Sequence, residues 1–173
     1  LIYLPVVDIE MEFNDINYDW QPAKDRSVDG GLALAAGPYG GLKPASGQLL
    51  AWSPAEQKAV WKVEQPTYLN GGVLATGGKL VFQGTIDGIF KAYDAGSGKV
   101  LWQFDAKAPI LAAPIAYEVE GTQYITVLTG SGMAFPIYAG MMLGEMVEKF
   151  GIDPRSQDRR VLTFALGGKT ALP

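Results

Sequence analysis

Acidic side chains close to the start of the chain are the first residues that could do chemistry. Asp8, Glu10 and Glu12 alternate along an extended segment, so in a continuous strand all three would lie on one face. Three carboxylates together could bind calcium, but calcium sites are usually loops that converge side chains and carbonyl oxygens. The alternative is a solvated strand edge that discourages aggregation, and a straight strand favours this second interpretation.

Histidine and cysteine are both absent from the 173 residues. Their absence excludes Ser-His-Asp catalysis, histidine-based zinc sites and haem ligation by histidine within this chain, and it excludes disulfide and thiolate chemistry. The net charge is −4 and no stretch is strongly basic, which argues against a nucleic-acid partner.

Two glycine-rich segments resemble ligand-binding loops at first sight. The segment G-P-Y-G-G-L-K-P-A-S-G at 37–47 lacks the G-x-x-x-x-G-K-[ST] order of a phosphate-binding loop, and no strand-to-helix context follows it. The segment N-G-G at 70–72 would let the backbone approach a ligand closely, but the same residues commonly form a simple turn.

The elements that must position these residues are predicted to be short strands. The chain has 22 glycines and 11 prolines, and so high a content of turn-forming residues is typical of strands joined by turns. The apolar run 133–144 is interrupted by Pro136 and is shorter than the about 20 residues that cross a bilayer. The first residues, L-I-Y-L-P-V-V, predict a strand and lack the features of a signal peptide. Because few natural proteins begin inside a strand without a Met, we expect a piece of a longer chain.

One pattern occurs twice, 41 residues apart. Ala, Lys and Trp stand at the same spacing in A-W-S-P-A-E-Q-K-A-V-W (51–61) and in A-Y-D-A-G-S-G-K-V-L-W (92–102), and Gly47 and Gly88 match as well. Each copy reads as strand, turn and strand. Between and after them we expect hairpins, one with Gly77-Gly78 as a two-residue turn and one turning near Glu120-Gly121.

A period of about 40 residues with four short strands in each period is typical of a β-propeller blade. Residues 47–130 carry the two clearest repeats. A blade cannot bury both of its faces alone, and two full blades with a few more strands cannot close a ring, so the sequence implies further blades. Residues 131–173 are expected to form a closing segment, with a short helix at 141–150, a last strand at 160–166 and an exit linker.

The second copy of the repeat is similar to the tryptophan-docking motif of the pyrroloquinoline quinone (PQQ) alcohol dehydrogenases. It fits A-x-D-x-x-[ST]-G-K-x-x-W at Ala92, Asp94, Ser97, Gly98, Lys99 and Trp102, whereas the first copy has Ser53 and Gln57 in place of Asp and Gly. Residues 66–88 resemble the family's W-N-G-G-x-L-A-T segment and residues 112–130 resemble the stretch that follows it. The tail R-V-L-T-F-A-L-G-G-K resembles the last strand of the quinohaemoprotein branch, before its cytochrome c domain.

This resemblance implies an all-β fold, the C-terminal third of an eight-bladed β-propeller that is incomplete in this chain. It implies a periplasmic enzyme that oxidises primary alcohols to aldehydes and passes electrons to a cytochrome c. The expected cofactor is PQQ, in a pocket shared with the missing blades, while calcium and haem c would be bound elsewhere in the parent enzyme. The implied partners are the remaining blades, a cytochrome c domain or subunit, and a small alcohol, with membrane association possible only through other subunits.

The resemblance assigns the chain no catalytic residue and no metal ligand, only one side of the quinone pocket. Asn70 and Leu69 match the segment that approaches the quinone in the family, although the family often has Trp at the position of Leu69. Ile110 and Leu111 match a position that borders the pocket. The alternative interpretations are a turn for N-G-G and ordinary core packing for Ile110 and Leu111.

The remaining motif residues are expected to be structural. Trp61 and Trp102 would be flat packing surfaces between neighbouring blades, and Asp87 and Asp94 would stabilise turns. Two other functions stay open. A propeller of this kind without a cofactor can act as a protein-binding scaffold, and the chain can be a split or truncated structural subunit.

Overall fold

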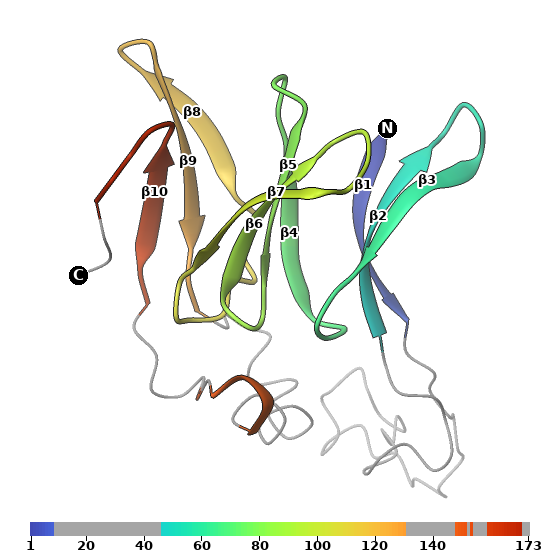
Figure 1. Ribbon diagram of the computed structural model, residues 1–173, viewed down its shortest axis with the longest axis horizontal. Coiled ribbons are helices and arrows are strands. Elements are labelled where there is room, and N and C mark those ends of the chain that lie inside the picture. The colour runs from blue at the N-terminus through green and yellow to red at the C-terminus, as the bar shows by residue number, and fades with distance from the viewer. Residues whose placement is uncertain (9–45, 131–147, 152, 154–158, 171–173) are drawn as a thin grey trace, which may run out of the picture.

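Three antiparallel sheets stand side by side in the computed structural model, which describes residues 1–8, 46–130, 148–151, 153 and 159–170 (Figure 1). The first sheet has the strand order β1-β2-β3, the second β4-β5-β6-β7 and the third β10-β9-β8. The strands are β1 (Ile2–Asp8), β2 (Ser46–Ser53), β3 (Lys58–Glu64), β4 (Asn70–Ala75), β5 (Leu80–Thr85), β6 (Ile89–Asp94), β7 (Val100–Asp105), β8 (Ile115–Val119), β9 (Thr122–Leu128) and β10 (Val161–Ala165).

The all-β prediction is confirmed, with one four-stranded sheet flanked by two three-stranded sheets in the described part of the chain. The expectation of two blade repeats at 47–130 stays a prediction, since residues 9–45 and 131–147 lie outside the described residues. The sheets do not close into a ring (Figure 1). The predicted last strand is β10, which pairs with β9. Of the predicted helix at 141–150, only 148–150 lies within the described residues, and it is helical.

The 41-residue repeat is visible in the strand pairing. Ala51 lies opposite Trp61 across β2 and β3, and Ala92 lies opposite Trp102 across β6 and β7. In both copies the pairing shifts by one residue directly after the alanine, so the same β-bulge is present twice. The repeated residues thus encode a repeated local geometry.

The core consists of two layers, one on each side of the second sheet. Alternate residues of β5 and β6 point to opposite faces, so Val81 and Tyr93 pack with Leu49 of the first sheet. Phe82 and Phe90 pack instead with Ile125 of the third sheet. Because both faces are covered, β5 is buried along almost its whole length, as expected for a strand inside a stack of blades.

The first interface between sheets depends on Trp61. Its indole lies against the turn of the next sheet, where a Cβ added to Gly98 would come within 2.7 Å of Trp61 Cε3. Its Nε1–H donates to the carbonyl oxygen of Ala95 at 3.0 Å, and the Tyr3 hydroxyl donates to the same oxygen at 3.0 Å. The prediction that Trp61 packs between blades is confirmed, and Gly98 is needed both for its φ of 72° and for this contact.

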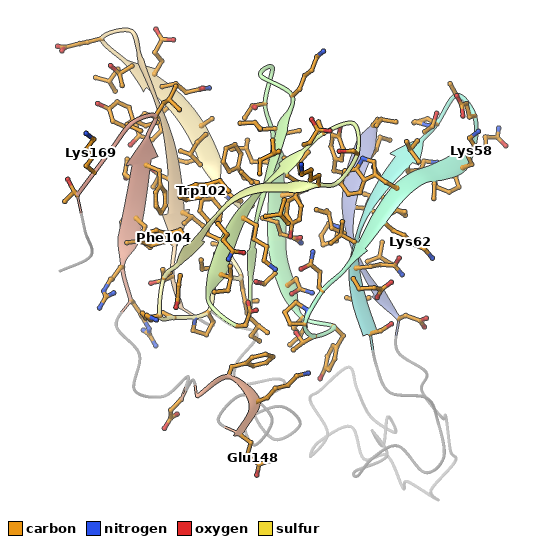
Figure 2. The ribbon with its side chains drawn as sticks, viewed as in Figure 1. Lys58, Lys62, Trp102, Phe104, Glu148 and Lys169 are labelled. Atoms are coloured by element: carbon orange, nitrogen blue, oxygen red, sulfur yellow. The ribbon has the colours of Figure 1, made fainter. Side chains whose placement is uncertain are left out.

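The second interface is aromatic. Trp102 is 40% exposed, yet its ring meets Phe164 of β10 edge to face, with centroids 5.3 Å apart. Phe104 also meets Phe164, at 5.0 Å. Figure 2 shows Trp102 and Phe104 on the side of β7 that faces β10. Trp102 therefore packs between the second and third sheets, as predicted.

The hairpin turns agree with the sequence in one case and differ in the other. Glu120 and Gly121 join β8 to β9 with φ values of 50° and 76°, the left-handed pair of a two-residue turn. Between β4 and β5, however, Gly77 and Gly78 are not a two-residue turn. The N–H of Lys79 donates to Thr76 O at 3.2 Å and Lys79 itself has a φ of 59°, so the loop is longer and Lys79 takes the left-handed position.

Substituting Gly98 by Ala should loosen the first interface. The new Cβ would be forced against the Trp61 indole and would sit at a positive φ, so we expect the free energy of unfolding to fall by about 1–3 kcal/mol. Thermal melting of the intact protein measures the loss. The matched control is Gly77→Ala, because a Cβ there meets nothing within 4 Å. Equal melting temperatures for the two variants would contradict the role of this contact.

Candidate cofactor site

The four residues predicted to line a cofactor occupy the same two positions in successive repeats. Leu69 and Ile110 are 41 residues apart, as are Asn70 and Leu111. The surrounding backbone repeats with them, because the N–H of Gln65 donates to Gly47 O and the equivalent N–H of Ala106 donates to Gly88 O, both at 2.9 Å. Each pair therefore lies where the chain leaves one blade and starts the inner strand of the next.

Glycine brings the two segments together. A Cβ on Gly71 would lie 2.7 Å from the carbonyl oxygen of Ile110, and a Cβ on Gly72 would lie 2.7 Å from the Cβ of Ala113. Neither glycine has a positive φ, so the requirement is for space and not for unusual backbone angles. The N-G-G segment begins strand β4 and is not a simple turn. Its glycines let β4 pack directly on residues 110–113.

Asn70 is half-buried, and only the nitrogen of its side-chain amide forms a hydrogen bond among the described residues. Its Nδ2 donates to Thr67 O at 2.8 Å, and the Thr67 hydroxyl donates to Leu69 O at 3.0 Å, so these bonds fix the bend before β4. Asn70 Oδ1 is buried and has no hydrogen-bond partner among the described residues. A buried acceptor without a donor costs about 1–3 kcal/mol, so this position favours a donor supplied by another molecule or another part of the protein.

Ile110 differs from its three companions. It is fully buried in the core between the second and third sheets, its side chain fills the space above Gly84, and its N–H donates to Thr85 O at 3.1 Å. The structure thus describes core packing for Ile110, whereas Leu69 and Leu111 are half-buried. That these residues line a cofactor stays a prediction.

A buried polar cluster lies beside this segment, and the sequence analysis missed it. Gln65 Nε2 donates to Gln83 Oε1 and to the Tyr93 hydroxyl, both at 3.2 Å, and Gln83 Nε2 donates to Gly71 O at 2.9 Å. Gln83 and Tyr93 are fully buried. The signal was a glutamine that directly follows the apolar residues L-V-F in one predicted strand, since a buried polar side chain requires partners.

Burial raises the pKa of the Tyr93 hydroxyl above its ordinary value. Asp87 raises the pKa further, whereas the hydrogen bond from Gln65 lowers it. The neutral phenol is therefore the form that the fold accommodates.

Asp87 and Asp94 are turn residues, as predicted. Asp87 Oδ1 accepts from the Thr85 hydroxyl and from the N–H of Ile89. Asp94 Oδ1 accepts from the Ser97 hydroxyl at 2.7 Å and from the N–H groups of Ser97 and Gly96. The bond from the Ser97 hydroxyl is the main cause that lowers the pKa of the Asp94 carboxyl.

A metal site is not formed by the described residues, in which no three Asp or Glu side chains gather. Of the acidic trio near the N-terminus, Asp8 ends β1 opposite Ser46, while Glu10 and Glu12 lie outside the described residues. The calcium and solvated-edge interpretations both stay untested. In the described part of the chain no helix is long and apolar enough to cross a membrane.

Comparison with known proteins connects this geometry to one group of enzymes. Residues 43–125 match the PQQ family model described as the β-propeller domain of glucose, ethanol and alcohol dehydrogenases. The chain is 40% identical over its whole length to the quinohemoprotein alcohol dehydrogenase ADH IIB of Pseudomonas putida, and 35% identical to 1-butanol dehydrogenase (cytochrome c) of Thauera butanivorans; it covers 24% of each.

The same fold is found among solved structures. The quinohemoprotein alcohol dehydrogenase of Comamonas testosteroni superposes with a TM-score of 0.71 and 33% identity, over 99% of this chain and 25% of that one. The chain thus spans about a quarter of the length of these relatives.

Alkaline pH should destabilise the protein through Tyr93. A pKa raised in the folded state means that the stability contributed by the neutral phenol is complete below the ordinary tyrosine pKa of about 10 and is lost as pH rises through the raised value. We expect the melting temperature of the intact protein to fall more steeply above about pH 10 than that of Tyr93→Phe.

The Tyr93→Phe variant should also be less stable at neutral pH, by about 1 kcal/mol, because Gln65 loses a partner. Tyr124→Phe removes one hydroxyl from a half-buried site and is the control. Identical alkaline slopes for the parent and Tyr93→Phe would show that this phenol does not control the transition.

Proposed function

Because this chain belongs to the β-propeller family of the PQQ-dependent alcohol dehydrogenases, we propose that it contributes blades and one side of the quinone pocket to such an enzyme. The parent reaction would be oxidation of a primary alcohol to an aldehyde, with electrons passed to a cytochrome c. The name of the relative from Thauera butanivorans, 1-butanol dehydrogenase (cytochrome c), supports both parts of this proposal.

The packing at the start of strand β4 supports the proposal. The Asn70–Gly71–Gly72 segment packs on residues 110–113, so that the starts of two successive inner strands lie together. In a propeller, the inner strands surround the central channel, and the end of such a channel is a common place for a ligand to bind. The half-buried Leu69 and Leu111 and the amide of Asn70 would then border one side of a shared pocket.

The residues present fit one edge of PQQ. This cofactor is a flat polycyclic quinone with several acceptor oxygens and one ring N–H, and it takes up the electrons from the alcohol when it is bound. Asn70 Oδ1, a buried acceptor without a partner among the described residues, suits a donor such as that N–H. Leu69 and Leu111 supply apolar surface beside it. The chain itself would bind and orient the quinone and exclude water, and it would not transfer the proton.

The other partners are part of the same proposal. The remaining blades would cover the open faces of the first and third sheets, where large apolar side chains such as Val60 of β3 and Val161 of β10 are exposed. Calcium and haem c would be held by parts of the enzyme beyond these residues. We place the enzyme in the periplasm, and membrane association would come only through other subunits.

The natural protein, purified intact, tests the proposal. Its mass under denaturing conditions should be several times 18.5 kDa, since the relatives are about four times as long, and it should release PQQ on denaturation. Asn70→Leu keeps the size of the side chain but removes the amide, so we expect weaker PQQ binding by about five- to tenfold in equilibrium dialysis.

Leu74→Ala is the control, since it removes apolar packing farther along the same strand β4 and leaves the hydrogen bond of the Asn70 amide in place. An 18.5 kDa protein that is folded and free of quinone would contradict the enzyme and favour a protein-binding scaffold or a structural subunit.

A further inference from the structure

The buried polar cluster of Gln65, Gln83 and Tyr93 joins two blades at the point where the N-G-G segment begins. Gln65 follows β3 of the first sheet, and its N–H is tied to Gly47 O at 2.9 Å. Gln83 lies in β5 and Tyr93 in β6 of the second sheet. The three side chains are therefore held by three different strands or strand ends, and all are buried.

The cluster ends on the backbone next to Asn70. Gln83 Nε2 donates to Gly71 O at 2.9 Å, and the same glutamine accepts from Gln65 at 3.2 Å. The strand β4 has an irregular pairing with β5 between Asn70 and Val73, so regular ladder bonds do not fix the backbone here. The side chain of Gln83 replaces a ladder bond at the residue that directly follows Asn70.

Stability alone gives a poor reason for three polar side chains at this place. Val81, two residues before Gln83 on the same face of β5, is fully buried in an apolar cluster, so this face accepts aliphatic residues. Gln65 Oε1 is buried without a hydrogen-bond partner among the described residues, which is an energetic cost. A buried network that carries such a cost is expected to fix one backbone geometry more than to add stability.

We propose that Gln65, Gln83 and Tyr93 are positioning residues, which orient the Asn70–Gly71 backbone and thereby aim Asn70 at the quinone. The proposal rests on the function proposed above and deepens it. Since Gln65 comes from the preceding blade, the orientation of Asn70 depends on the docking of the two blades. Gln65, Gln83 and Tyr93 themselves do not touch the cofactor.

The test is a titration of the full-length apoenzyme with PQQ in buffer that contains calcium ions. Tryptophan fluorescence reports the binding, and the melting temperature of each apoenzyme is measured as well. Gln83→Met keeps the length of the side chain and removes both hydrogen bonds, so the Kd for PQQ should rise by about five- to tenfold. Tyr93→Phe is the milder second variant and should raise the Kd in the same direction by about twofold or more.

Val81→Ala is the matched control. It opens a cavity on the same face of the same strand but leaves every bond of the cluster in place, so it should lower the melting temperature and keep the Kd within about twofold of the parent.

Two results would overturn the positioning role. One is an unchanged Kd in Gln83→Met and Tyr93→Phe, and the other is a Kd that rises in proportion to the lost melting temperature in all variants, Val81→Ala included. In both cases the parent apoenzyme would still bind PQQ. If the parent does not bind PQQ, the proposed function fails and this inference fails with it.

Discussion

The contact between the Trp61 indole and the turn at Ala95 to Gly98 is the constraint on which the described structure depends. A flat ring can lie on a turn only if the turn presents backbone and no side chain, and Gly98 meets this condition. The hydrogen bond from Nε1 to Ala95 O removes the remaining freedom of the ring to slide. One contact of this kind fixes both the distance and the rotation between two neighbouring sheets.

The proposed site follows from this docking. Because the two blades are held in register, the loop that leaves the first blade delivers Gln65 to the interior of the second and Asn70 to the start of its inner strand. The equivalent loop of the second blade delivers Ile110 and Leu111 to the same end. Glycine at 71 and 72 then allows the two segments to touch. The site is thus assembled from repeated segments. Asn70 and the polar cluster of Gln65, Gln83 and Tyr93 are the parts that do not repeat.

Much of the fold could be predicted from the sequence, because the repeated residues act locally. An alanine opposite a tryptophan, a bulge after the alanine and a lysine that ends the turn belong to one hairpin, so their spacing is preserved in both copies. The turn at Glu120-Gly121 was predictable for the same reason. The type predicted for the turn at Gly77-Gly78 was wrong, since neither glycine has a positive φ and Lys79 has one instead.

The site was harder to predict, because its partners are far apart in the sequence. Gln65, Gln83 and Tyr93 follow no period, and nothing local indicates that they meet. Ile110 was ambiguous for another reason. The sequence allowed it to be either part of a pocket wall or part of the core, and only the folded structure shows that it is buried above Gly84. Sequence patterns therefore locate the segment that faces the cofactor more reliably than they assign each side chain in it.

If the proposed function holds, Asn70 and the strand starts around it face a bound quinone. A cryo-electron microscopy structure of the intact protein with PQQ bound measures this directly. We expect to find the Asn70 amide within hydrogen-bond distance of the cofactor, Leu69 and Leu111 beside it, and Gln83 still bonded to Gly71 O. A quinone bound in another part of the protein, with Asn70 Oδ1 paired to a protein donor, would contradict it.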